Sequence, residues 1–212
     1  MVQFIFEFVT SALLVALGFG LTHLMIRPCC IKFISNNLLL SPNAISIYRI
    51  ILGPVCAYLS QTSPQAFLYL FIVGCISDYT DGVWARATSN ITKVGKFLDP
   101  LGDKVFYLSV LWVFQQIGYL SPVTYWLFVV SETFSQFSRP ILVYLNLEMA
   151  ANRWGKWKAT LTFFLVYYLY VVQYHGTLFN FNPIIAELLF TLCLLLSVMS
   201  SVTKFLAKKL QQ

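Results

Sequence analysis

"SDYTDGVWARATSNITKVGKFLDPLGDK", residues 77–104, contains all four aspartates of a chain of 212 residues. The whole chain has only eight acidic residues, and 58% of it is hydrophobic. Soluble domains carry roughly 25% charged residues, whereas this chain carries 10%. So much apolar surface does not fit inside one aqueous core, and the solvent that suits it is a lipid bilayer. The aspartates therefore gather in the middle of a chain that avoids charge elsewhere.

Seven apolar stretches run along the chain, at about residues 3–26, 44–60, 65–84, 97–119, 122–147, 157–174 and 182–203. Each is close to the roughly 20 residues that a membrane-spanning helix needs. Lipid cannot satisfy open backbone groups, and no barrel-like alternation is visible, so the stretches predict helices. The first stretch carries Glu7 and lacks a basic region before it, which favours a retained membrane helix over a cleaved signal. The predicted fold class is an all-α integral membrane protein.

The lysines and arginines predict how the helices are oriented. Eleven of the 14 fall in alternate connections and in the tail, and the connections in between contain no lysine or arginine. The eleven are Arg27, Lys32, Arg86, Lys93, Lys96, Arg153, Lys156, Lys158, Lys204, Lys208 and Lys209. Basic connections face the cytoplasm, so the N-terminus is expected outside and the C-terminus inside. The net charge of +6 then indicates contact with anionic headgroups and no binding of nucleic acid.

The expected domain organisation is one helical domain with additions at both ends. Residues 1–27 are predicted to form an extra N-terminal membrane helix, and 28–43 a more polar juxtamembrane segment. The catalytic domain is expected at 44–205, and a basic cytoplasmic tail at 206–212.

Helical spacing places the aspartates in two pairs. Asp78 and Asp81 are three residues apart, and Asp99 and Asp103 are four apart on the next helix, so each pair shares one helix face. The connection at about 87–94 is short, which predicts that the two helices are antiparallel neighbours. The two pairs should then face each other near the cytoplasmic boundary. Small residues and one cation share or border these faces: Gly82, Ala85, Arg86 and Gly95.

Four carboxylates cannot share a site of low polarity without protons or cations. An aspartate at the centre of a membrane helix costs about 2.5–3.5 kcal/mol, before any mutual repulsion. An all-carboxylate set suits Mg²⁺ or Mn²⁺ better than zinc, and its charge could neutralise two divalent ions, an arrangement used for displacement at phosphorus. Gly82 and Ala85 leave room for a substrate, and Arg86 can pair with phosphate. A solvated cluster, or the ion pathway of a carrier, are the alternatives.

The pattern Asp-x₂-Asp-Gly-x₂-Ala-Arg-x₈-Gly-x₃-Asp-x₃-Asp, from Asp78 to Asp103, resembles the CDP-alcohol phosphotransferase signature at every fixed position. The resemblance covers about residues 41–203 and implies a six-helix catalytic core, to which the first helix is an addition. It implies transfer of a phosphatidyl group from a CDP-linked lipid to an alcohol, with release of CMP. It further implies a metal set of two ions on Asp78, Asp81, Asp99 and Asp103, with Asp103 as the base. The residues implied for the CDP-lipid are Asp81, Gly82, Ala85, Arg86 and Gly95.

Three flanking segments resemble the branch of this family that uses glycerol 3-phosphate: "SPNAISIYRI" at 41–50, "FLDPLGDKV" at 97–105 and "GKWKAT" at 155–160. The middle segment is also similar to the cardiolipin synthases of the family, which use phosphatidylglycerol. The resemblance therefore implies CDP-diacylglycerol as donor and glycerol 3-phosphate as acceptor, with the cardiolipin reaction as the alternative. Ser131 stands where the glycerophosphate branch commonly has arginine.

Basic residues after the fourth core stretch favour an anionic acceptor. Arg139 lies within an apolar stretch that also holds Glu132, and Lys156 follows in the next basic connection. We expect Arg139 and Lys156 to bind the acceptor phosphate. Arg153 and Lys158 are expected to be surface anchors at the membrane edge.

The remaining expectations concern metal ligands, partners and location. His23 and His175 have no carboxylate or second histidine at ligand spacing, so no metal is expected on either. The resemblance implies that two chains could form a homodimer. A short chain without a transit peptide favours the bacterial plasma membrane over the mitochondrial inner membrane, with the active site on the cytoplasmic side.

Overall fold

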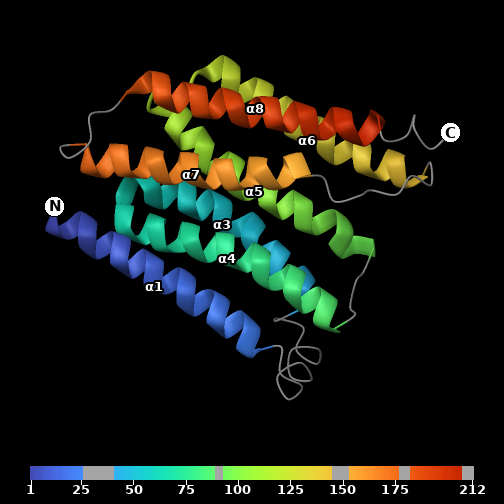
Figure 1. The fold of residues 1–212 in the computed structure, drawn as a ribbon, viewed down its shortest axis with the longest axis horizontal. Helices are drawn as coiled ribbons and strands as arrows, with labels where there is room; N and C mark the ends of the chain where they lie inside the picture. Colours follow the sequence, from blue (N-terminus) through green and yellow to red (C-terminus); the bar gives the residue numbers. More distant parts are fainter. Residues whose placement is uncertain (26–40, 89–92, 145–152, 177–181, 207–212) are drawn as a thin grey trace. The chain divides into compact units, whose positions relative to one another are not determined.

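The structure, a computed structural model, describes residues 1–25, 41–88, 93–144, 153–176 and 182–206, and these form α-helices and turns without a strand (Figure 1). The helices are α1 (Val2–Leu24), α3 (Pro42–Thr62), α4 (Pro64–Thr88), α5 (Lys93–Gln116), α6 (Pro122–Tyr144), α7 (Arg153–His175) and α8 (Pro183–Leu206). The all-α prediction is confirmed. Most of the expected juxtamembrane segment and of the basic tail lies outside the described residues.

Proline and one glycine account for where several helices begin and turn. Four helices start at Pro42, Pro64, Pro122 and Pro183, where the missing N–H removes no bond because the first turn has no partner for it. At α3 the Ser41 hydroxyl also accepts a hydrogen bond from the backbone N–H of Ala44 at 3.3 Å, a normal N-cap. The turn between α5 and α6 uses Gly118 with φ of 84°, a conformation that disfavours a side chain.

Four of the described helices are long and apolar enough to cross a membrane: Val2–Leu24, Asn43–Thr62, Pro64–Trp84 and Ile184–Thr203. This is a membrane protein. Helices α5, α6 and α7 do not reach the same level of apolar composition within their described residues. Two of them begin with charged residues, such as Lys93 in α5 and Arg153 in α7. The expected count of seven spans stays a prediction.

The chain divides into two compact units, Met1–Val110 and Leu111–Gln212. In the first unit, α4 packs against both α1 and α3, and α1 runs along α4 (Figure 1). Helices α3 and α5 approach closely at Gly53 of α3. A Cβ added there would lie 2.9 Å from the Phe106 Cα of α5. At Gly102 it would lie 2.8 Å from the Ser46 carbonyl oxygen. Small residues at such contacts let membrane helices pack backbone to backbone.

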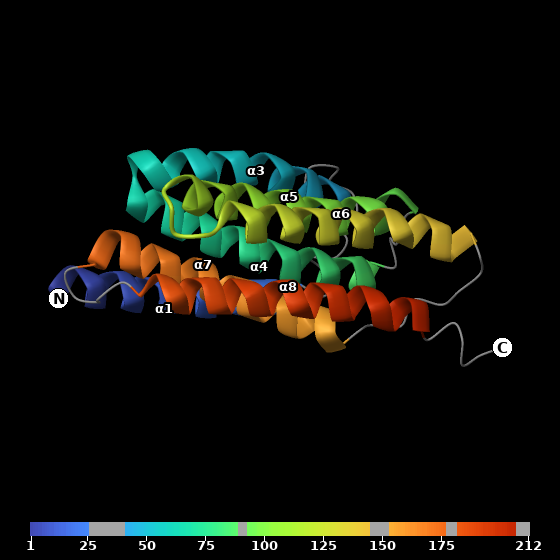
Figure 2. The same cartoon turned by 90° about the horizontal axis from the view of Figure 1, so that it is seen from above.

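In the second unit, α8 packs against α6 and α7, and Figure 2 shows α6, α7 and α8 as long, nearly straight ribbons. Its core is apolar and aromatic. Phe128 of α6 meets Phe190 of α8 edge to face, with ring centroids 5.3 Å apart, and both are fully buried. Leu165, Val166 and Leu169 contribute the buried side of α7.

Candidate active site

The predicted aspartate pairs lie on neighbouring helices of the first unit. Asp78 and Asp81 are on α4, and Asp99 and Asp103 are on α5. The two helices touch at Phe106 of α5, whose ring lies against Gly74 of α4. Because position 74 meets 106 while 78 comes near 103, the helices run antiparallel, as the short connection predicted.

The carboxylates meet on one arginine that comes from α3. Arg49 is 1% exposed, and its Nη1 donates a hydrogen bond to Asp78 Oδ1 at 2.8 Å. Nη1 also donates to Asp103 Oδ1, and Nη2 donates to Asp81 Oδ2. Three carboxylates from two helices thus converge on a single guanidinium. Arginine suits this position because its planar fork presents several donors in fixed directions.

The three carboxylates that bind Arg49 differ in their exposure. The Asp81 side chain is 5% exposed, the Asp103 side chain 36% and the Asp78 side chain 57%. One side of the site is therefore closed by the helices, and the other is reachable from outside. A substrate can approach Asp103 and Asp78, while Asp81 stays at the floor of the site.

Asp99 is held separately, by the same helix that carries the arginine. The Ser46 hydroxyl donates to Asp99 Oδ1 at 2.5 Å. Ser46 and Arg49 are three residues apart and share one face of α3. This helix therefore contacts all four aspartates. Sequence reasoning did not assign either residue to the site, although an arginine inside an apolar helix is by itself a sign of function.

The donor set fits a hard divalent cation. Three carboxylates share the single guanidinium of Arg49, and Asp99 adds a fourth carboxylate beside them. Carboxylate oxygens are the ligands that Mg²⁺ and Mn²⁺ prefer. In the part of the chain described, no group of three histidine, cysteine or acidic side chains is arranged to hold a metal. The carboxylates of Asp78, Asp81 and Asp103 bind Arg49. The aspartates thus fit divalent ions by their chemistry, and in this structure the Arg49 guanidinium lies between three of them.

The other positions expected to bind the CDP-lipid lie on the same two helices. Gly82 is half-buried directly after Asp81, and Gly95 is buried in the first turn of α5. Ala85 and Arg86 lie in the last turns of α4, and their side chains are outside the described ones.

The expected acceptor residues lie in the second unit. Arg139 is in α6, and its side chain is outside the described ones; Lys156 is exposed on α7. The expectation for Lys158 as a surface anchor is wrong. Its side chain is only 15% exposed, and its Nζ donates to the buried Glu132 Oε1 at 2.7 Å. The reason is that its long stem reaches from α7 back to α6, and a buried carboxylate needs such a partner.

Glu132 also belongs to a wider polar group in the second unit. The hydroxyl of Ser197, on α8, donates to the same carboxylate oxygen. Ser131 and Ser197 lie 2.9 Å apart, oxygen to oxygen. Ser131, where the glycerophosphate branch commonly has arginine, is therefore part of the contact between α6 and α8.

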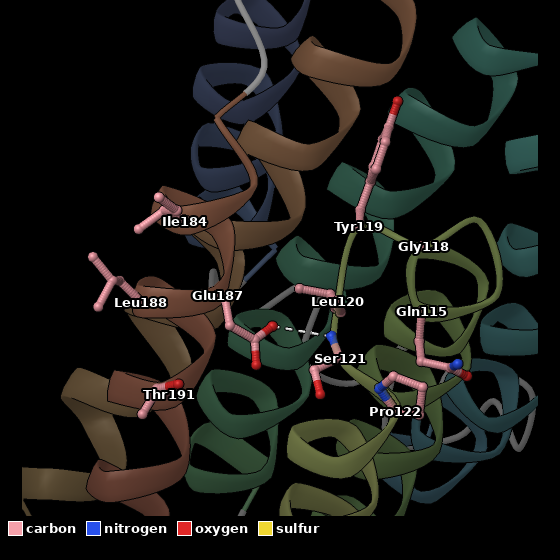
Figure 3. Close-up of a pocket in the computed structure, with 10 residues that line it drawn as sticks. All are labelled: Gln115, Gly118, Tyr119, Leu120, Ser121, Pro122, Ile184, Glu187, Leu188 and Thr191. Carbon is pink, nitrogen blue, oxygen red and sulfur yellow. Dashed lines mark hydrogen bonds between the residues drawn. The ribbon is translucent and has the colours of Figure 1, made fainter.

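A pocket of about 540 Å³ lies between the α5–α6 turn and the first turns of α8, all within the second unit (Figure 3). Its acidic residue, Glu187, accepts a hydrogen bond from the Ser121 backbone N–H at 3.0 Å and another from the Thr124 hydroxyl. The carboxylate thus caps the N-terminus of α6, where negative charge is favoured. None of the predicted site residues lines this pocket, so it is separate from the aspartate site.

Comparison with known proteins agrees with the family resemblance of the aspartate site. The family model of CDP-alcohol phosphatidyltransferase matches residues 39–199. The chain belongs to the CDP-alcohol phosphatidyltransferase family. The match includes α3, α4 and α5 with all four aspartates, so the resemblance of the signature is confirmed. Members of this family are generally metal-dependent, in agreement with the oxygen-rich donor set.

Several similar proteins are named CDP-diacylglycerol--glycerol-3-phosphate 3-phosphatidyltransferase, and three of them are from bacteria of different genera. The protein of Mycoplasma pneumoniae is 37% identical over 110 residues, which cover 52% of this chain and 48% of that one. The Haemophilus influenzae protein is 29% identical over 133 residues, 56% of this chain and 69% of that one. The Bacillus subtilis protein is 31% identical over 134 residues, which cover 55% of this chain and 69% of that one. The chain thus spans about half the length of the first relative and just over two thirds of the others.

Proposed function

We propose that this protein transfers the phosphatidyl group of CDP-diacylglycerol to glycerol 3-phosphate and releases CMP. The observation that carries the proposal is the convergence of Asp78, Asp81 and Asp103 on one partly open site, in a member of this family. The acceptor is supported by the names of three relatives from different bacteria.

In this proposal Asp78, Asp81, Asp99 and Asp103 hold two Mg²⁺ or Mn²⁺ ions. When bound, such ions neutralise the pyrophosphate and stabilise the departing CMP. Arg49 must release at least part of the carboxylate set for this, and Ser46 keeps Asp99 turned toward the site.

The proposed reaction is one displacement at phosphorus. The acceptor hydroxyl oxygen forms a bond to the phosphorus that carries diacylglycerol, and the bond from that phosphorus to the CMP oxygen breaks. Asp103 takes the hydroxyl proton. An alcohol is a poor nucleophile until a nearby base removes this proton. The 36% exposure of the Asp103 side chain leaves room for the acceptor. Gly82, Ala85, Arg86 and Gly95 would bind the cytidine diphosphate part.

The site is proposed to lie at the cytoplasmic side of a bacterial plasma membrane, with the N-terminus outside. The alternation of basic connections supports this orientation. The parallel course of α1 and α4 agrees with a single span, α3, between them, and holds for either orientation of the chain. Lipid tails can then stay in the bilayer while both polar substrates meet at the interface. The division at residues 27, 43 and 205, and the homodimer, stay predictions.

Arg139 and Lys156 are proposed to bind the acceptor phosphate. Lys156 is exposed on the first turns of α7 and so is accessible to a polar ligand. Lys158 is excluded from this role, because it already pairs with Glu132.

The experiment supplies the purified, lipid-reconstituted protein with CDP-diacylglycerol, Mn²⁺ or Mg²⁺ and a panel of alcohols, and identifies the products by mass. We expect phosphatidylglycerophosphate and CMP. Cardiolipin formed only from phosphatidylglycerol would replace the acceptor and keep the reaction class. Solute flux into liposomes without any CMP release would favour a carrier and contradict the proposal.

A further inference from the structure

Helix α1 lies outside the family match, which begins at residue 39, yet it does not behave as a simple anchor. Its three buried residues, Glu7, Ser11 and Thr22, are all polar. Many of its apolar side chains, such as Leu13, Leu17 and Leu21, are exposed. This is the pattern of a membrane helix whose lipid-facing side is apolar and whose protein-facing side makes specific polar contacts.

Those contacts run along α4 in one register. The Glu7 carboxylate accepts from Gln65 Nε2 at 3.4 Å, and the Thr10 and Tyr69 hydroxyls lie 3.0 Å apart. Further along, Gly18 lies against Ile76, where a Cβ would come within 2.7 Å of the Ile76 Cδ1. Each contact joins residues about 58 positions apart, so the helices are parallel. A glycine and a set of hydroxyl pairs at constant spacing specify rotation and axial position together.

The last contacts fall between the two aspartates of α4. The Thr22 and Thr80 hydroxyl oxygens are 2.9 Å apart, and His23 Nε2 is 3.0 Å from the Tyr79 hydroxyl oxygen. Tyr79 and Thr80 are the two residues between Asp78 and Asp81. The Phe19 ring also meets Tyr79 edge to face, with centroids 4.7 Å apart. The turn that carries both carboxylates is thus held from behind by α1.

We propose that α1 is a positioning helix, in which Thr22 and His23 fix the turn of α4 that presents Asp78 and Asp81. The two residues touch neither substrate nor ion and act through Thr80 and Tyr79. This inference rests on the proposed function, because it assumes that the aspartate pair does the chemistry. It deepens that function by giving the helix outside the family match a part in the active site. Small displacements of catalytic groups cost rate steeply.

The test compares two isosteric substitutions that remove the same kind of contact. Thr22→Val removes the hydroxyl pair beside the aspartates, and Thr10→Val removes the pair with Tyr69. Tyr69 lies nine residues before Asp78, about 13.5 Å along the helix. Both variants lose one interhelical hydroxyl contact, so a merely structural role would lower the thermal midpoint in either variant and leave kcat and Mn²⁺ binding unchanged in both. Thr22→Ser, which keeps the hydroxyl, serves as the rescue, and Leu21→Ala on the lipid-facing side is a further control.

The readouts are kcat, KM for CDP-diacylglycerol, the Kd for Mn²⁺ and the thermal midpoint in the same lipid. We expect Thr22→Val to lower kcat and weaken Mn²⁺ binding about 10-fold, with Thr22→Ser near wild type and Thr10→Val changing only the midpoint. His23→Phe keeps an aromatic ring but loses the contact of Nε2 with the Tyr79 hydroxyl, and it should have the same effects as Thr22→Val to a smaller degree. Equal behaviour of Thr22→Val and Thr10→Val would overturn the inference. A wild-type protein that neither binds Mn²⁺ nor releases CMP would instead overturn the proposed function.

Discussion

Each of the two units contains an ion cluster, and the clusters differ in the ratio of acidic to basic groups and in exposure. In the first unit one guanidinium faces three carboxylates, and two of these are partly exposed. In the second unit one ammonium faces one carboxylate that is almost fully buried, with a serine hydroxyl as its further partner. In the second cluster each charge of the Glu132–Lys158 pair has an opposite partner, as a structural contact between helices needs. The first has more carboxylates than basic groups and an open side, as a site for cations and substrate needs.

The largest expected effect is at the open cluster. Asp103→Asn removes the proposed base with almost no change in shape, so turnover should fall by about 10²–10⁴-fold. Binding of CDP-diacylglycerol should persist, because the other contacts to the nucleotide remain. Initial rates of CMP release and equilibrium binding of the lipid measure the two quantities. Full activity in this variant would remove the base assignment.

A large effect on stability, and none on chemistry, is expected at the closed cluster. Glu132→Gln removes the carboxylate that pairs with Lys158, whose side chain is only 15% exposed, and this should cost about 3–5 kcal/mol of unfolding free energy. The matched variant Glu132→Gln with Lys158→Met removes both charges and should recover much of that loss. Thermal and denaturant unfolding in one lipid system measure it. A single variant as stable as wild type would show that the pair does not hold α6 to α7.

A smaller effect, opposite in sign for two quantities, is expected at Arg49. Arg49→Gln leaves the carboxylates of Asp78, Asp81 and Asp103 without their common donor, so the metal-free protein should unfold at lower temperature. The same change frees the carboxylates for a cation, so the Kd for Mn²⁺ should fall, by about 10-fold if one charge contact of 1.4 kcal/mol is at stake. Unfolding midpoints with and without Mn²⁺ separate the two. Weaker Mn²⁺ binding in Arg49→Gln would mean that the guanidinium supports the ion-bound state.

Sequence reasoning predicted the helices and the aspartate pairs because both depend on local spacing. Apolar runs of the right length give membrane helices, and three- or four-residue intervals put Asp78 with Asp81 and Asp99 with Asp103. The antiparallel contact of α4 and α5 followed from a short connection. These features need no knowledge of which helix packs on which.

The residues that sequence reasoning missed depend on contacts between distant segments. Arg49 and Ser46 join the site only because α3 packs on both α4 and α5. Lys158 was mistaken for an anchor because its partner, Glu132, lies 26 positions earlier on another helix. Thr22 and His23 look ordinary until Thr80 and Tyr79 are found beside them. The signal that could have found them was the set of polar residues in α1, of which Glu7, Ser11 and Thr22 are buried.

The central claim is that aspartates of α4 and α5 form one cation site, and titration calorimetry with Mn²⁺ in the presence of CDP-diacylglycerol tests it most directly. The account predicts about two ions bound per chain in the wild-type protein and a loss of binding in Asp78→Asn and Asp81→Asn. A wild-type protein that binds no Mn²⁺ with the nucleotide-lipid present, or aspartate variants that bind it unchanged, would contradict the account.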